Sequence, residues 1–242
     1  MANGNPLFNE KAFSQTMNRA HTGGIMTLQG TLNKTFFLLL LCAMGGMLGF
    51  NHYQDLAGYY MLTGLAVFVV AMIIIFKKPT APILAPVYAV GEGLLLGLLS
   101  AAYNVQYQGI VLQAISITML VFLAMLFIYR TGIIKVNSTF IIAITAATAA
   151  IALFYLISLG LMFFGVNVAY FTSTSTFSIV INVVICLVAA FNFLIDFHFI
   201  DVMTSEITAP KYMEWYAGFS LLVTLVWLYV EILRLLGRSR NR

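Results

Sequence analysis

The chain has 242 residues, of which 62% are hydrophobic and 8% are charged, with a net charge of +4 and a mean hydropathy of +0.98. A soluble domain carries about 25% charged residues, so this composition excludes a soluble globular protein and indicates an integral membrane protein. The basic residues lie in short loops and tails between apolar runs. That pattern is typical of membrane topology and does not indicate nucleic-acid binding.

Seven apolar runs follow a polar N-terminal segment. A helix of about 20 residues crosses a hydrocarbon core of about 30 Å. A membrane β-barrel would need alternating strands of about ten residues, and these runs are continuous. We therefore predict an all-α polytopic membrane protein with a polar cytoplasmic tail (1–34), a seven-helix transmembrane domain (35–236) and a basic C-terminal tail (237–242). The predicted spans are 35–51, 56–76, 82–103, 108–129, 139–165, 176–203 and 211–236.

Lysine and arginine predict which side of the membrane each loop faces. The N-terminal segment and the loops after spans two, four and six carry eight of them, and the other three loops carry none. By the positive-inside rule, the N-terminus is cytoplasmic. The arginines of the C-terminal tail disagree, because seven spans place that tail outside. Either the last span is re-entrant or the earlier charges set the orientation, and we favour the second explanation.

Five of the chain's eight acidic residues lie in the last two spans and the turn between them, although residues 136–195 carry no charge at all. These five acids are Asp196, Asp201, Glu206, Glu214 and Glu231. A sixth, Glu92, lies between glycines in the third span, about 15 Å deep at 1.5 Å per residue. An ionisable group inside a span is costly to bury and is by default a functional hypothesis.

Counting residues from the turn near Thr208 predicts the depth of each acid. Asp201 and Glu214 lie level with each other near the cytoplasmic mouth. Asp196 lies about 12 Å deep, close to the level of Glu92. Glu231 is offset from Asp196 by about 16 Å, unless the hairpin is uneven.

Neighbouring carboxylates in a low-dielectric site disfavour each other's ionisation, which predicts two states. Protonated acids share hydrogen bonds and seal a path, whereas ionised acids repel, attract cations and admit water. Calcium takes carboxylate and carbonyl oxygens, and without a dense ligand loop any calcium site at Asp196 and Glu231 would be weak and transient. Asn192 shares a helix face with Asp196. The alternative is that each acid is structural, with Glu231 in an ion pair with Arg234 three residues on.

Several motifs occur in order along the chain: TGGIMTLQGTLNKT before span one, PVYAVGEGLLLG in span three, LIDF in span six, APKYMEWY before span seven and LYVE within it. Together they resemble the transmembrane Bax inhibitor motif family, in its prokaryotic branch, over most of the chain from about residue 22. The resemblance implies seven helices, the last one central and wrapped by two three-helix layers. It also implies a location in a prokaryotic inner membrane.

The resemblance further implies a pH-sensitive calcium leak that is gated by a pair of acids joining helices six and seven. Asp196 and Glu231 match the two motif positions. Because the residue count separates them, Glu214 or Glu92 could serve as the partner instead. The family's basic residue at the cytoplasmic end of helix two, which bonds to the acid pair, corresponds to Lys77 or Lys78.

We consider four functions, in descending order of the support that the sequence gives them. The leading hypothesis is a proton-sensitive calcium or cation leak channel in the lipid bilayer, with calcium as permeant ion and no cofactor. The alternative is a regulator that binds a membrane protease or cell-death factor without transport. A proton-coupled transporter lacks the expected inverted repeat. An enzyme is least favoured, because no HExxH, nucleophile elbow or zinc-type spacing occurs. Cys42 and Cys186 lie inside spans and are interpreted as unpaired apolar residues.

Overall fold

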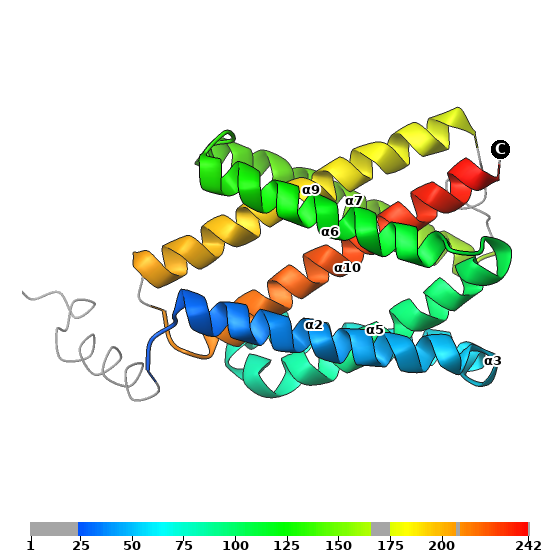
Figure 1. Ribbon diagram of the computed structural model, residues 1–242, viewed down its shortest axis with the longest axis horizontal. Helices are drawn as coiled ribbons and strands as arrows, with labels where there is room; N and C mark the ends of the chain where they lie inside the picture. The colour runs from blue at the N-terminus through cyan, green and yellow to red at the C-terminus, as the bar shows by residue number, and fades with distance from the viewer. Residues whose placement is uncertain (1–23, 166–174, 207–208, 242) are drawn as a thin grey trace, which may run out of the picture.

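A computed structural model describes residues 24–165, 175–206 and 209–241, which lie almost entirely in long helices (Figure 1). Within these residues, seven helical spans are long and apolar enough to cross a membrane, so the predicted all-α class with seven spans is confirmed. The helices are α2 (Leu28–Asn51), α3 (Tyr53–Leu56), α4 (Tyr60–Phe76), α5 (Ala81–Gln106), α6 (Ile110–Thr131), α7 (Ser138–Phe163), α9 (Thr176–Ser205) and α10 (Met213–Arg240), with short 3-10 helices at Ala57–Tyr59 and Lys78–Thr80.

Both ends of the transmembrane domain differ from the predicted boundaries. The first span begins at Leu28 rather than at residue 35, because Thr27 caps it by accepting a hydrogen bond from the backbone of Gly30. Residues 28–34 of the predicted tail are therefore helical, and residues 1–23 lie outside the described part of the chain. At the other end α10 continues to Arg240 instead of stopping at residue 236.

The last helix lies in the middle of the bundle. Of the 18-residue apolar window of α10, 56% is buried, a larger share than in any other described span. Its neighbours fall into two groups, with α2, α4 and α5 packed together on one side and α6, α7 and α9 on the other (Figure 1). The polar side chains of α10 are therefore held away from lipid, inside the protein.

Helices α2 and α5 approach each other closely through glycine. A Cβ atom added at Gly45, Gly49, Gly93 or Gly97 would overlap backbone atoms of the facing helix. Small residues allow this close contact between membrane helices, so these glycines are packing positions. The close pair forms a rigid wall beside Glu92, which lies on α5 one residue before Gly93.

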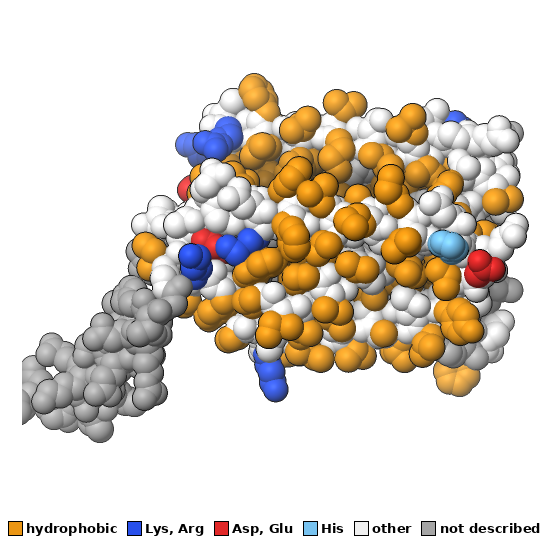
Figure 2. All heavy atoms as spheres, turned by 60° about the horizontal axis from the view of Figure 1, so that its bottom comes forward, with side chains coloured by type: hydrophobic (Ala, Val, Ile, Leu, Met, Phe, Trp, Pro, Cys, Tyr) orange, Lys and Arg blue, Asp and Glu red, His pale blue; other side chains and the backbone are white. Residues whose placement is uncertain are grey.

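The outer surface of the bundle exposes many hydrophobic side chains, as contact with a lipid bilayer requires. On the face drawn in Figure 2, hydrophobic side chains form a broad band between two ends, and most of the visible Lys and Arg side chains lie toward one of these ends. Helix α7 buries none of the residues in its apolar window, so most of its side chains would face lipid. Both cysteines are free thiols, with Cys42 buried and Cys186 partly buried, as predicted.

Candidate functional site

Asp196 is a buried carboxylate that joins the last two helices. Its side chain projects from α9 toward α10 and is only 9% exposed. Ser220 donates to Oδ1 at 2.7 Å, and Thr224, one turn further along α10, donates to Oδ2 at 2.6 Å. Both carboxylate oxygens are therefore satisfied by neutral hydroxyl groups, and the described residues place no cation in contact with Asp196.

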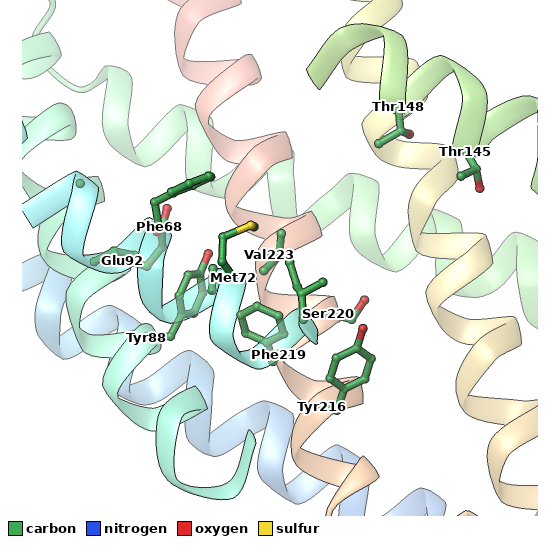
Figure 3. A pocket seen from close by; sticks show the side chains of 14 residues that line it. Phe68, Met72, Tyr88, Glu92, Thr145, Thr148, Tyr216, Phe219, Ser220 and Val223 are labelled. Atoms are coloured by element: carbon green, nitrogen blue, oxygen red, sulfur yellow. The ribbon is translucent and has the colours of Figure 1, made fainter. Parts of the chain in front are cut away.

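A cavity of about 920 Å³ lies between α4, α5, α7 and α10, next to this carboxylate. Its wall is mostly apolar, with six polar side chains: Tyr88, Glu92, Thr145, Thr148, Tyr216 and Ser220. Ser220 and Tyr216 lie on the side of α10 toward Thr145 and Thr148, while Glu92 lies beside Tyr88 on the opposite side (Figure 3). Ser220 therefore touches both the cavity and Asp196, and one hydroxyl group separates the cavity from the buried charge.

Glu231 is held in a different way, nearer the C-terminal end of α10. It is 0% exposed and accepts hydrogen bonds from three helices: from Tyr155 of α7 at 2.6 Å, from Asn182 of α9 at 2.8 Å and from Arg234 of α10. The Arg234 guanidinium reaches Oε1 at 2.9 Å and Oε2 at 3.1 Å. This acid has a counter-charge, and the ion pair with Arg234 expected from the spacing is present.

Glu214 forms a third buried cluster, at the cytoplasmic end predicted for α10. It is 1% exposed, forms an ion pair with Lys34 of α2, and accepts hydrogen bonds from the backbone and hydroxyl of Thr27 at 3.0 and 2.9 Å. Backbone bonds from Met26 to Ala209 and from Lys211 to Gly24 hold the same two segments together. The TGGIMTLQGTLNKT motif thus clamps the start of α2 onto the turn between α9 and α10.

The remaining predicted site residues have other neighbours. Asp201 accepts a hydrogen bond from Tyr129 of α6 at 3.2 Å, and Asn192 donates to Thr148 of α7 at 2.8 Å. Lys77 and Lys78 are exposed, and the Lys78 ammonium lies 5.1 Å from the centre of the Tyr216 ring. Among the described contacts, neither lysine forms an ion pair with a carboxylate.

Asp196 and Glu231, the two acids that the family resemblance implies as a pair, do not contact each other. Asp196 lies level with Ser220 and Thr224, whereas Glu231 is seven residues beyond Thr224, about 10 Å further along the helix. Glu231 is therefore offset from Asp196 in the predicted direction, by less than the predicted distance of about 16 Å. The acid pair implied by the family resemblance is therefore not formed in this structure, where hydroxyl groups of α10 contact Asp196 instead.

Sequence reasoning missed the uncharged partners of these acids. Ser220 and Thr224 stand four residues apart in an apolar helix, a spacing that places both on one face and that could have identified them. Tyr155 and Asn182 are harder to single out, because each is one of several polar residues in its span and the sequence does not show which of them meet α10. Lys34 was counted only toward topology, although it forms the ion pair with Glu214.

Comparison with known families gives a match over nearly the whole chain. A family model described as Bax inhibitor 1 like matches residues 5–241. The chain belongs to the Bax inhibitor 1 like family. This match confirms the resemblance to the family, while its prokaryotic branch stays a prediction. No curated protein matches the chain.

Membership of the Bax inhibitor 1 like family indicates the broad class of the protein. The chain is an integral membrane protein of a family of membrane channels or regulators, which is not a known enzyme family. Its central helix α10 takes part in all three buried carboxylate clusters, because it carries Glu214 and Glu231 and supplies the hydroxyl partners of Asp196. The clusters differ in the kind of partner that the acid has. Glu231 and Glu214 have basic partners, whereas Asp196 has hydroxyl partners.

Proposed function

We propose that this protein is a pH-sensitive cation leak channel, with calcium as a permeant ion and Asp196 as its principal gate. The observation that supports this most directly is the position of Asp196. It is a buried carboxylate with two hydroxyl donors and no counter-charge among the described residues, and one of these donors lines a pocket between α4, α5, α7 and α10 that is partly open to the surface. A functional role is the default interpretation of such a group in a membrane.

Hydroxyl partners suit a switch because they work with both states of the acid. Serine and threonine both donate and accept hydrogen bonds. When Asp196 is ionised, Ser220 and Thr224 donate to it, and when it is protonated, it can donate to one of them. Gain or loss of a proton therefore changes the charge at the helix interface by one unit without leaving a partner charge unpaired.

The charge change is expected to control entry of ions into the cavity. An ionised Asp196 attracts a cation and water toward Ser220, whereas the protonated acid leaves a largely apolar cavity that water and ions avoid. Glu92, in the same wall, supplies a second oxygen group for a cation in transit. Calcium accepts such mixed oxygen ligands, and so few of them imply weak, short-lived binding.

We further propose that the N-terminal side is cytoplasmic and that the protein resides in a prokaryotic inner membrane. The orientation rests on the basic loops after α4, α6 and α9. The C-terminal arginines, which disagreed with this orientation, have partners of their own: Arg234 contacts Glu231, Arg238 contacts the carbonyl of Ser178, and Arg240 contacts Gln113. Arg234 and Arg238 are engaged within the bundle, whereas Arg240 is exposed at its surface.

Calcium uptake into liposomes containing the purified protein, measured from pH 6 to 8, tests the proposal. Wild type should show a flux that depends on pH, and Asp196→Asn should flatten that dependence because the residue can no longer change charge. Asp201→Asn is the matched control, since Asp201 lies on the same helix, is exposed and contacts Tyr129. It should retain the wild-type pH profile.

Two results would change the conclusion. A pH-dependent flux that survives in Asp196→Asn would remove this residue as the gate. Wild type without flux at any pH would favour the second function, a regulator that binds a membrane protease or cell-death factor. That protein should then copurify with such a partner, and the buried acids would be structural.

A further inference from the structure

The C-terminal part of α10 presents a line of charged residues to the N-terminal half of α9. Glu231, Arg234 and Arg238 are spaced three and four residues apart, which places them along one helix face. On α9, Ser178 and Asn182 lie opposite: the Ser178 carbonyl accepts from Arg238 at 3.0 Å, and Asn182 donates to Glu231. This set of contacts is separate from the Asp196 cavity.

The order of the charges along this face of α10 decides which groups an approaching cation would meet first. Glu231 is fully buried, Arg234 is 21% exposed and lies one turn nearer the end of the bundle, and Arg238 lies one turn beyond that. A cation that approached the Glu231 carboxylate from this end would meet two guanidinium groups first. A cation that approached from the Asp196 side would find both Glu231 oxygens already bonded to Arg234.

An oxygen group without a partner lies in the same cluster. The side-chain oxygen of Asn182 is the only buried side-chain nitrogen or oxygen atom among the described residues that has no hydrogen-bond partner. Asn182 is 0% exposed, and its amide nitrogen is the atom that contacts Glu231. A half-turn of the amide would exchange the two atoms and put an oxygen beside the carboxylate, the type of ligand set that a hard cation prefers.

We infer that Arg234 is a tethered counter-ion that occupies the cation position at Glu231 and closes the pathway at this end of the bundle. This inference rests on the proposed function and extends it with a second closure, distinct from Asp196. When Arg234 withdraws, Glu231 and the Asn182 oxygen become available to a cation. When Arg234 returns, it displaces that cation.

Cys186 offers a test that does not depend on calcium. Its sulfur lies 3.9 Å from the Asn182 amide nitrogen, one helical turn along α9, so it reports on entry of a cation into this cluster. The probe is a membrane-impermeant methanethiosulfonate reagent with a trimethylammonium group, applied to the full chain carrying Cys42→Ala. Arg234→Gln should raise the rate of Cys186 labelling about tenfold, the effect of about 1.4 kcal/mol.

Three controls make this labelling result specific. Arg240→Gln removes an exposed arginine that contacts Gln108 and Gln113 and should leave the rate unchanged. Arg234→Lys keeps the charge and should stay close to wild type. A neutral, membrane-permeant methanethiosulfonate reagent should label Cys186 equally in all variants, because it reaches the thiol through the lipid.

The outcomes separate this inference from the proposed channel. If Arg234→Gln labels no faster than wild type, the inference is overturned, even where wild type conducts calcium. If it labels faster while no variant conducts calcium, the closure stands and the calcium proposal fails. Should Arg234→Gln fail to fold, the double variant E231Q/R234Q removes both charges together. Labelling of the double variant at the wild-type rate would then overturn the inference.

Discussion

Asp196 and Glu231 are both buried acids at the interface of α9 and α10, yet their surroundings are opposite in kind. Asp196 contacts two hydroxyl groups of α10 and lies next to a cavity. Glu231 contacts an arginine, a tyrosine and an asparagine from three helices. The partners, rather than burial, therefore distinguish an acid that can change its charge freely from an acid whose charge is part of the structure.

Under the proposed function, a switch at Asp196 would not need a carboxylate pair. Two neighbouring acids respond to protons through mutual repulsion. A single acid between hydroxyl groups responds through its own charge, because no fixed cation is left unpaired when it is protonated. Glu231, by contrast, cannot lose its charge without leaving Arg234 unpaired in a site where both residues are largely buried.

Neutralising the two acids should have very different effects on stability. Glu231→Gln leaves the guanidinium of Arg234 without its counter-charge, and breaking a buried ion pair costs about 3–5 kcal/mol. Asp196→Asn keeps a side chain that can both accept from and donate to hydroxyl groups, so it should cost only about 1 kcal/mol. Thermal unfolding in detergent, followed by circular dichroism, measures both changes. Equal losses in the two variants would contradict the comparison.

The sequence predicted the architecture better than the contacts at each acid. Seven spans, a hairpin around residue 208 and the offset of Glu231 from Asp196 all follow from hydropathy and from 1.5 Å per residue. The partners do not follow from these rules, because helix rotation decides which face of α10 meets Asp196. Periodicity in a uniformly apolar span does not report that rotation. The Lys34–Glu214 contact was beyond reach for another reason, since it joins residues 180 positions apart.

Glu214 extends the comparison to a second acid with a basic partner. If a basic partner marks a structural acid, Glu214→Gln should destabilise the protein by about 2 kcal/mol and leave the pH profile of flux unchanged, because Lys34 is 20% exposed and retains some solvation. Gly30→Val should act similarly, since a side chain at Gly30 would overlap the Glu214 carboxylate. Gly160→Val is the control, with nothing within 4 Å of the added Cβ atom and no place in the lining of the cavity. A pH profile that shifts in Glu214→Gln would show that an acid with a basic partner can also act as the pH switch.

The hydroxyl donors should affect function more than stability. Ser220→Ala removes one of the two hydrogen bonds to Asp196, which costs about 1 kcal/mol. Because the lost donor favoured the ionised acid, the pH of half-maximal flux should rise relative to wild type. Thr224→Val should shift the midpoint in the same direction without changing the cavity wall, since Thr224 does not line it. An unchanged midpoint in both variants would show that these hydroxyl groups do not control the charge of Asp196.

Lys78 provides the smallest and most discriminating change. The family resemblance assigns a basic residue after helix two to the gating acids, but here the Lys78 ammonium lies over the ring of Tyr216, four residues before Ser220. An exposed cation–π contact contributes about 0.5–1 kcal/mol, so Lys78→Met should reduce stability by no more than this and leave the flux profile unchanged. Lys77→Met is the matched control, because no ring contact is present there among the described residues. If Lys78→Met alone shifted the pH midpoint, Asp196 would be responding to a distant basic residue, and the distinction between hydroxyl-bound and arginine-bound acids would no longer explain which acid is the switch.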